Sequence, residues 1–255
     1  MTEGVLSEIN AQIWLVFAVF LRMAPAISFV PGYGESYVSV RIKLSVAGFF
    51  SIAIAPVLQP YLPASSLTGT ELLIFAVREI TVGYFIGIVS RGMIILLEKA
   101  GTIISQNISL AQMLGNATEP MPVVSHILTT TAIALLYSTT LADQMLYGLF
   151  ASYFAQLPDW NAITGYFAAT ITSLMDYIFD HAVILSAGFA SLMFVYYLCI
   201  GFINKAMPQF MVSFIGIPFV ALFSIYFLHQ HSEFLLTVWQ EKALTILMMP
   251  FEGPR

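Results

Sequence analysis

The chain has 255 residues, of which 59% are hydrophobic and only 9% are charged, and its net charge is −5. Soluble globular domains carry about 25% charged residues, so a soluble protein of this length would lack the charge to cover its surface. The negative balance also argues against nucleic acid as a partner, because a phosphate backbone needs a basic face. We therefore expect an all-α polytopic membrane protein. No polar linker divides the sequence, which indicates a single membrane domain over residues 1–255.

Six apolar runs reach or approach the roughly 20 residues that a helix needs to cross a bilayer. They cover residues 13–30, 44–58, 72–97, 123–141, 182–203 and 210–228. Prolines lie in the connections, for example Pro60, Pro120 and Pro208, where helices are expected to break. Basic residues follow the first, third and fifth runs, which places both termini outside the cytoplasm by the positive-inside rule. Residues 229–255 are interpreted as a C-terminal tail.

Charged residues inside the first and third runs need partners. Arg22 would cost at least about 2.5–3.5 kcal/mol at the bilayer centre, so it either pairs inside the protein or lies near a run end and reaches the interface. Arg78 and Glu79 are adjacent and point in different directions on a helix. Each needs a partner elsewhere, in an ion-linked site or in a structural bridge, which we favour. Gly83 and Gly87 are spaced to admit a second helix closely.

Residues 106–122, with the sequence QNISLAQMLGNATEPMP, differ from the rest of the chain. They are too polar for lipid and too apolar for an ordinary solvated loop. Composition leaves two structures open, a plug or re-entrant loop enclosed by protein and an amphipathic helix on the membrane surface. The residues that define the candidate plug are Gln106, Asn107, Gln112, Met113, Asn116 and Met121.

The remaining polar residues give weak signals for chemistry. Asp176, Asp180 and His181 suit either a proton relay or, as is more common, the polar end of a helix. His229 and His231 lack the three or four ligands that a metal site needs. No nucleophile, metal or nucleotide motif occurs in the sequence. We expect neither enzymatic activity nor a cofactor.

Three stretches together resemble one known family. LRMAPAISFVPGYGESYVSVRIKL is similar to an R-x-x-P…P…V-R opening. REITVGYFIGIVSRGMIILLEKAGTIISQNISLAQ is similar to an E-x-x-x-G-x-x-x-G…AG-x-x-I-x-x-Q block, and NKAMPQFMVSFIGIPF to an R-x-x-P-Q-x-N-x-F…G-x-P signature. In this order they resemble the FliR/SctT family of export-apparatus subunits from flagellar and virulence type III secretion. The matching positions include Arg22, Glu79, Gly83, Gly87, Pro208 and Gln209.

The resemblance implies a subunit of a helical, ring-like export gate in the bacterial inner membrane. Its partners would be P-type and Q-type subunits and a FlhB/SctU-type switch protein, and its substrates would be unfolded secreted proteins. It favours the plug interpretation of residues 106–122 and gives Arg22, Glu79, Gly83, Gly87, Pro208 and Gln209 a role in helix packing and assembly. We favour the flagellar over the virulence system. The main alternative to an export subunit is a small-molecule or ion transporter, although the chain lacks the inverted repeat typical of transporters.

Overall fold

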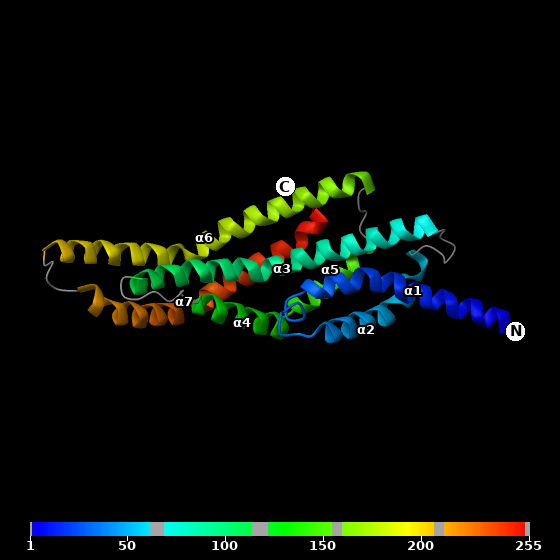
Figure 1. The fold of residues 1–255 in the computed structure, drawn as a ribbon, viewed down its shortest axis with the longest axis horizontal. Helices are drawn as coiled ribbons and strands as arrows, with labels where there is room; N and C mark the ends of the chain where they lie inside the picture. The colour runs from blue at the N-terminus through cyan, green and yellow to red at the C-terminus, as the bar shows by residue number, and fades with distance from the viewer. Residues whose placement is uncertain (1, 62–68, 114–121, 155–159, 207–211, 253–255) are drawn as a thin grey trace. The chain divides into compact units, whose positions relative to one another are not determined.

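The computed structural model describes residues 2–61, 69–113, 122–154, 160–206 and 212–252 (Figure 1). The described residues form helices and no strands, which confirms the predicted all-α class. The elements are α1 (Thr2–Phe29), α2 (Val40–Leu58), the short 3₁₀ helix η1 (Gln59–Tyr61), α3 (Gly69–Met113), α4 (Val123–Ser138), α5 (Leu141–Ala151), α6 (Trp160–Ala206) and α7 (Val212–Glu252).

Several helices are long and apolar enough to cross a membrane, as predicted. Four such segments lie among the described residues, Glu8–Phe29, Val40–Tyr61, Gly69–Asn107 and Ile163–Ala206. Helices α4 and α5 together would make a fifth, bent by 74° at the break between them. The polytopic membrane class is therefore confirmed, although the division into spans differs from the six predicted runs.

The helix boundaries differ most where apolar runs were taken as whole helices. The third run is part of α3, which has 45 residues, and the fifth is part of α6, which has 47. The sixth run and nearly all of the expected tail, residues 229–255, share one helix, because α7 continues to Glu252. Hydropathy marks only the most apolar part of a helix, whereas a helix continues through polar residues until its backbone is interrupted. In α6 no proline interrupts residues 160–206.

The chain forms two compact units. The first contains Met1–Gly92, Thr140–Leu174 and Thr245–Arg255, and the second contains Met93–Thr139 and Met175–Leu244. Helices α3, α6 and α7 each contribute residues to both units.

In the first unit, α1 and α2 lie side by side as an antiparallel pair (Figure 1). Their shared core consists of buried apolar side chains, namely Val19, Met23, Ile27, Ala47, Ala55 and Leu58. The connection between the two helices turns at Gly32, whose φ of 87° lies in the left-handed region that favours glycine.

In the second unit, the part of α7 expected as a tail packs against α3. Trp239 is fully buried, and its indole Nε1 donates a 2.8 Å hydrogen bond to the carbonyl oxygen of Met93. On α6, Phe189 meets Phe227 of α7 edge to face, with ring centroids 4.7 Å apart. Burial of these aromatic side chains fixes α7 as a structural part of the unit.

Candidate functional site

Arg22 of α1 and Glu79 of α3 form a buried ion pair in the first unit. Arg22 Nε donates to Glu79 Oε2 at 2.7 Å, and Arg22 Nη2 donates to Glu79 Oε1 at 2.9 Å. The two side chains are only 7% and 5% exposed. This two-pronged arrangement matches the planar fork of a guanidinium to a carboxylate. Arg22 therefore has an internal partner, and the interpretation that it reaches the membrane interface is wrong.

The turn that follows α5 completes the surroundings of Arg22. Its Nη1 donates to the backbone oxygen of Ser152 at 2.9 Å and to Ser152 Oγ at 3.2 Å. The guanidinium carbon lies 3.9 Å from the centre of the Tyr153 ring, a cation–π contact that strengthens when water is excluded. The Tyr153 hydroxyl donates to the carbonyl oxygen of Val19 at 3.2 Å. One arginine thus joins α1, α3 and the end of α5.

Burial keeps the Tyr153 hydroxyl in its protonated form. Loss of hydration raises the pKa of Tyr153, an effect that the charge of Arg22 opposes and that of Glu79 reinforces. The neutral phenol can therefore remain a donor to Val19 at any physiological pH. The cluster contains one cation and one carboxylate, and their charges compensate each other.

Two glycines on α3 continue the contact with α1. A Cβ atom at Gly83 would lie 2.2 Å from the carbonyl oxygen of Arg22 and 2.8 Å from Cγ of Pro25. A Cβ atom at Gly87 would lie 2.8 Å from the carbonyl oxygen of Ala26. Real Cβ atoms do not approach backbone atoms this closely, so only glycine permits this separation of the two helices. The structure thus gives both glycines a packing contact.

A second ion pair lies at the other end of the contact between α3 and the α1 region. Arg91 of α3 binds Glu35, in the α1–α2 connection, through two hydrogen bonds, of which the one from Nη2 to Oε2 measures 3.4 Å. The side chains are 25% and 15% exposed. Glu79, Gly83, Gly87 and Arg91 are spaced at intervals of four residues and occupy one face of α3. We call these four residues the α1–α3 seam.

The seam fixes how α3 lies against α1. The contacts advance in the same sense along α3 and along the chain from α1 into the α1–α2 connection, from Arg22 with Glu79 to Glu35 with Arg91. Because α3 supplies the carboxylate at one end and the guanidinium at the other, a reversed α3 would oppose like charges. Removing one member of a buried pair leaves an uncompensated charge, at a cost of about 3–5 kcal/mol. The arrangement specifies the direction and register of α3 against α1. Each of its charged side chains is paired with one of opposite charge.

A similar close approach joins α3 and α4 in the second unit. A Cβ atom at Gly101 would lie 2.5 Å from Cα of Ser125. The Ser125 hydroxyl donates to the carbonyl oxygen of Glu98 at 2.9 Å, and the Thr102 hydroxyl lies 3.4 Å from the Ser125 hydroxyl. These contacts hold together the chain segments on either side of residues 106–122.

Comparison with known proteins identifies the family. The chain matches bacterial export proteins, family 1, over residues 13–245. It belongs to this family. Three curated relatives are each named flagellar biosynthetic protein FliR. The one from Caulobacter vibrioides is 24% identical over 241 residues, or 92% of this chain and 95% of the relative. That from Escherichia coli is 28% identical over 223 residues (85% and 82%), and that from Pectobacterium carotovorum subsp. carotovorum is 26% identical over 213 residues (79% and 78%). The predicted resemblance to the FliR/SctT family is confirmed.

In this export protein the structure places only some of the predicted plug residues. Gln106 is exposed on α3, and Asn107 Nδ2 donates to the carbonyl oxygen of Ile103 at 2.8 Å. The Tyr197 hydroxyl of α6 donates to the carbonyl oxygen of Asn107 at 2.9 Å. Gln112 and Met113 belong to the last turn of α3, whereas Asn116, Met121, Pro208 and Gln209 lie outside the described residues.

The other predicted polar residues are not brought together into a reactive site. Arg78 is exposed on α3, away from the buried face that carries Glu79. Asp176 and Asp180 are also exposed, and His181 Nδ1 lies 2.9 Å from the carbonyl oxygen of Tyr177 on its own helix. Among the residues that the structure describes, no group of three His, Cys, Asp or Glu side chains could hold a metal ion.

Sequence reasoning missed part of the site in this family member. It did not identify Ser152 and Tyr153, which contact Arg22, and no local pattern marks them. The pair formed by Glu35 and Arg91 was also missed, although one signal was visible. Arg91 extends the four-residue spacing of Glu79 and the two glycines by one step.

Proposed function

We propose that this chain is a membrane subunit of the type III protein export gate that serves flagellar biosynthesis. The observation that carries the proposal is the family match over residues 13–245. The name of the curated relatives, flagellar biosynthetic protein FliR, favours the flagellar over the virulence system. The candidate spans are consistent with a multi-pass protein of the bacterial inner membrane.

The role we propose is structural and not enzymatic. In the buried cluster around Arg22, the cation and the carboxylate bind each other, and a backbone carbonyl and a serine hydroxyl accept two further hydrogen bonds from Arg22. A catalytic site instead exposes a nucleophile, an acid or a base to a substrate. The seam is better suited to maintaining the shape of the subunit while a transported chain passes elsewhere.

The partners we propose are P-type and Q-type export-gate subunits and a FlhB/SctU-type switch protein. On α6, Phe179, Phe194 and Phe202 are 70%, 64% and 73% exposed. Large apolar side chains exposed along a helix are suited to membrane lipid or to the helices of neighbouring subunits. Assembly with partners would cover such a surface, and unfolded secreted proteins would pass through the channel that the assembly encloses.

We further propose that residues 106–122 form the plug of this channel. Gln106 is exposed and Asn107 is bound by Tyr197, so the start of the segment combines a free polar side chain with a fixed backbone. Gly101 contacts Ser125, which brings the chain just before the segment close to the chain just after it. Methionine fills irregular gaps, so Met113 and Met121 would make a seal that a passing chain can displace.

The proposed function is tested by deleting the gene in its host and measuring flagellar protein in the culture medium. We expect export to stop and to return with the wild-type gene, while any virulence-type secretion in the same cells continues. Normal flagellar export without the gene would refute the proposal.

The plug is tested separately with a variant lacking residues 112–121. We expect the complex to assemble but to conduct ions when reconstituted in bilayers, because the seal is removed. An assembled deletion complex with wild-type conductance would refute the plug while leaving the export role intact.

A further inference from the structure

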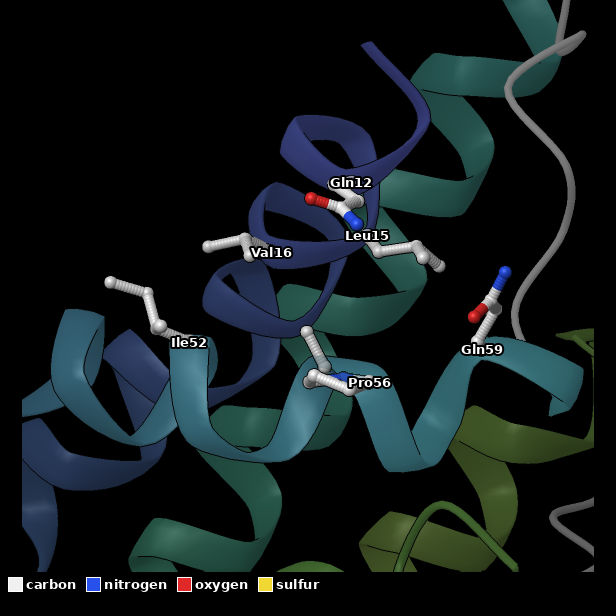
Figure 2. Close-up of a pocket in the computed structure, with 7 residues that line it drawn as sticks. Gln12, Leu15, Val16, Ile52, Pro56 and Gln59 are labelled. Atoms are coloured by element: carbon white, nitrogen blue, oxygen red, sulfur yellow. The ribbon is translucent and has the colours of Figure 1, made fainter. Parts of the chain in front are cut away.

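A groove between α1 and α2 carries an inference that is independent of the export role. It encloses about 220 Å³ and is lined by Gln12, Leu15 and Val16 on α1 and by Ile52, Ala55, Pro56 and Gln59 on α2. Figure 2 shows these side chains along the two helices on either side of the hollow. Five of the seven lining residues are apolar, and one of these, Ala55, is only 2% exposed.

The two polar residues lie at the same end of the helix pair. Gln12 directly precedes the first apolar run, residues 13–30, and Gln59 directly follows the second, residues 44–58. Because α1 and α2 are antiparallel, both amides lie near one boundary of the hydrocarbon layer, and the apolar part of the groove extends from there into the layer. This position matches a lipid, with a polar head at the boundary and a chain below it.

The groove is too small for a helix of a partner subunit. An α-helix with its side chains is about 10–12 Å across, so a partner helix could place only single side chains in a hollow of about 220 Å³, whereas an acyl chain can lie along it. The surface around it is apolar and exposed, since Ile13 is 62% and Ile52 is 64% exposed. Pro56, which lines the groove, has no backbone N–H, so it cannot donate to the carbonyl oxygen of Ile52. An acyl chain has the flexibility to follow such a surface.

Charge near the groove distinguishes between lipid head groups. Glu8 lies four residues before Gln12, on the same face of α1 and exposed. Among the described residues that line the groove, none is basic. The nearest basic residues on α2, Arg41 and Lys43, lie at its other end, about 24 Å away for 16 residues of helix. A head group with a net negative charge would meet the Glu8 carboxylate here, and none of the residues that line the groove supplies a cation to compensate it.

We propose that the groove binds one acyl chain of a zwitterionic phospholipid. The amide groups of Gln12 and Gln59 donate hydrogen bonds to its phosphate or ester oxygens, and the carboxylate of Glu8 attracts its ammonium group. Leu15, Val16 and Ile52 contact the chain. Such a lipid would fill the groove between α1 and α2 at the end of the helix pair where Gln12 and Gln59 lie.

Photolabelling of the assembled complex tests this proposal. The complex, with the subunits that co-purify, is placed in nanodiscs containing phosphatidylethanolamine with a diazirine in one acyl chain, and adducts are located by mass spectrometry. We expect adducts on Val16 and Ile52, and weaker labelling with the matching phosphatidylglycerol probe. Replacing Gln12 or Gln59 by Leu should lower labelling about fivefold each, as expected for one lost hydrogen bond.

A pair of tryptophan substitutions on α2 gives the matched control. Ile52→Trp puts a large side chain into the groove and should lower the adduct on Val16 several-fold. Val57→Trp changes a residue of similar exposure, 57%, that does not line the groove, and should leave labelling unchanged. Uniform labelling along the exposed face of α1 and α2, equal labelling by the two lipids, or an unlabelled groove beside a labelled surface would overturn the proposal.

Discussion

The backbone carbonyl oxygen of Arg22 lies where the side chain of any residue larger than glycine at position 83 would begin, 2.2 Å from the site of its Cβ atom. The same arginine binds Glu79, one helical turn earlier on α3, through its guanidinium. Backbone and side chain of Arg22 therefore hold the same two turns of α3. The close approach permits the ion pair, and the ion pair fixes the register of the approach.

Gly83→Ala should separate α1 from α3 and lower stability. Overpacking a tight contact costs about 1–3 kcal/mol, and the backbone carbonyl at this site cannot move away as a side chain would. We expect a lower unfolding temperature in detergent and a reduced yield of assembled complex. Gly48→Ala is the control, because a Cβ atom at Gly48 meets nothing within 4 Å. Equal effects of the two substitutions would show that helix propensity, and not the seam, determines the outcome.

Glu79→Ala should lower the stability of the subunit and the yield of assembled complex, because the buried guanidinium of Arg22 would lose its counter-charge. The expected cost is about 3–5 kcal/mol, which can be measured by denaturant titration in detergent. Exchanging the pair, with Arg22→Glu and Glu79→Arg together, should recover part of the stability lost in either single variant. A Glu79→Ala complex that assembles normally but does not export would instead indicate a direct role of this carboxylate in transport.

Arg91→Ala should destabilise the subunit less than Arg22→Ala. The Arg91–Glu35 pair is partly exposed, with side chains 25% and 15% accessible, so water can solvate Glu35 when its partner is removed. Pairs accessible to solvent contribute up to about 1 kcal/mol. A double-mutant cycle at each pair measures the two coupling energies. A larger coupling energy at Arg91–Glu35 would contradict the assignment of the buried pair as the main anchor.

Trp239→Ala should loosen α7 from α3. The substitution removes a fully buried ring together with its hydrogen bond to Met93, at a cost of about 3–5 kcal/mol. Protease susceptibility of the C-terminal residues is the measurement, and we expect it to rise. Phe234→Ala is the control on the same helix, because Phe234 is 64% exposed. If both variants were cleaved alike, α7 would not be anchored through Trp239.

The sequence predicted the parts of the site that follow from the free-energy cost of a charge inside an apolar run and from residue spacing. Glu79 lies inside an apolar run and had to have a partner, and the spacing of Gly83 and Gly87 predicted a close helix contact. The identity of the partner could not be predicted, because Arg22 and Glu79 are 57 residues apart and either could have met another helix. Ser152 was beyond prediction for a similar reason, since it is distant in sequence and its shorter bond to Arg22 is accepted by a backbone carbonyl, which every residue has.

Helix lengths were predicted less well than helix positions. Asp176, Asp180 and His181 interrupt the apolar sequence, so they were placed before the fifth apolar run, yet they belong to α6. Exposed carboxylates on one face do not break a helix whose other face is buried by Leu174 and Ile178. A hydropathy average over both faces does not separate the exposed polar face from the buried apolar one. The same reasoning applies to α7, where polar residues around Gln240 precede the buried Ala243 and Ile246.

Affinity purification of the tagged chain from flagellated cells, followed by mass measurement of the intact detergent-solubilised particle, tests the central proposal most directly. We predict one discrete assembly that contains P-type and Q-type export-gate subunits, and its loss in the Glu79→Ala variant. A stable particle that contains only this chain and binds a small solute would contradict the account and support a transporter.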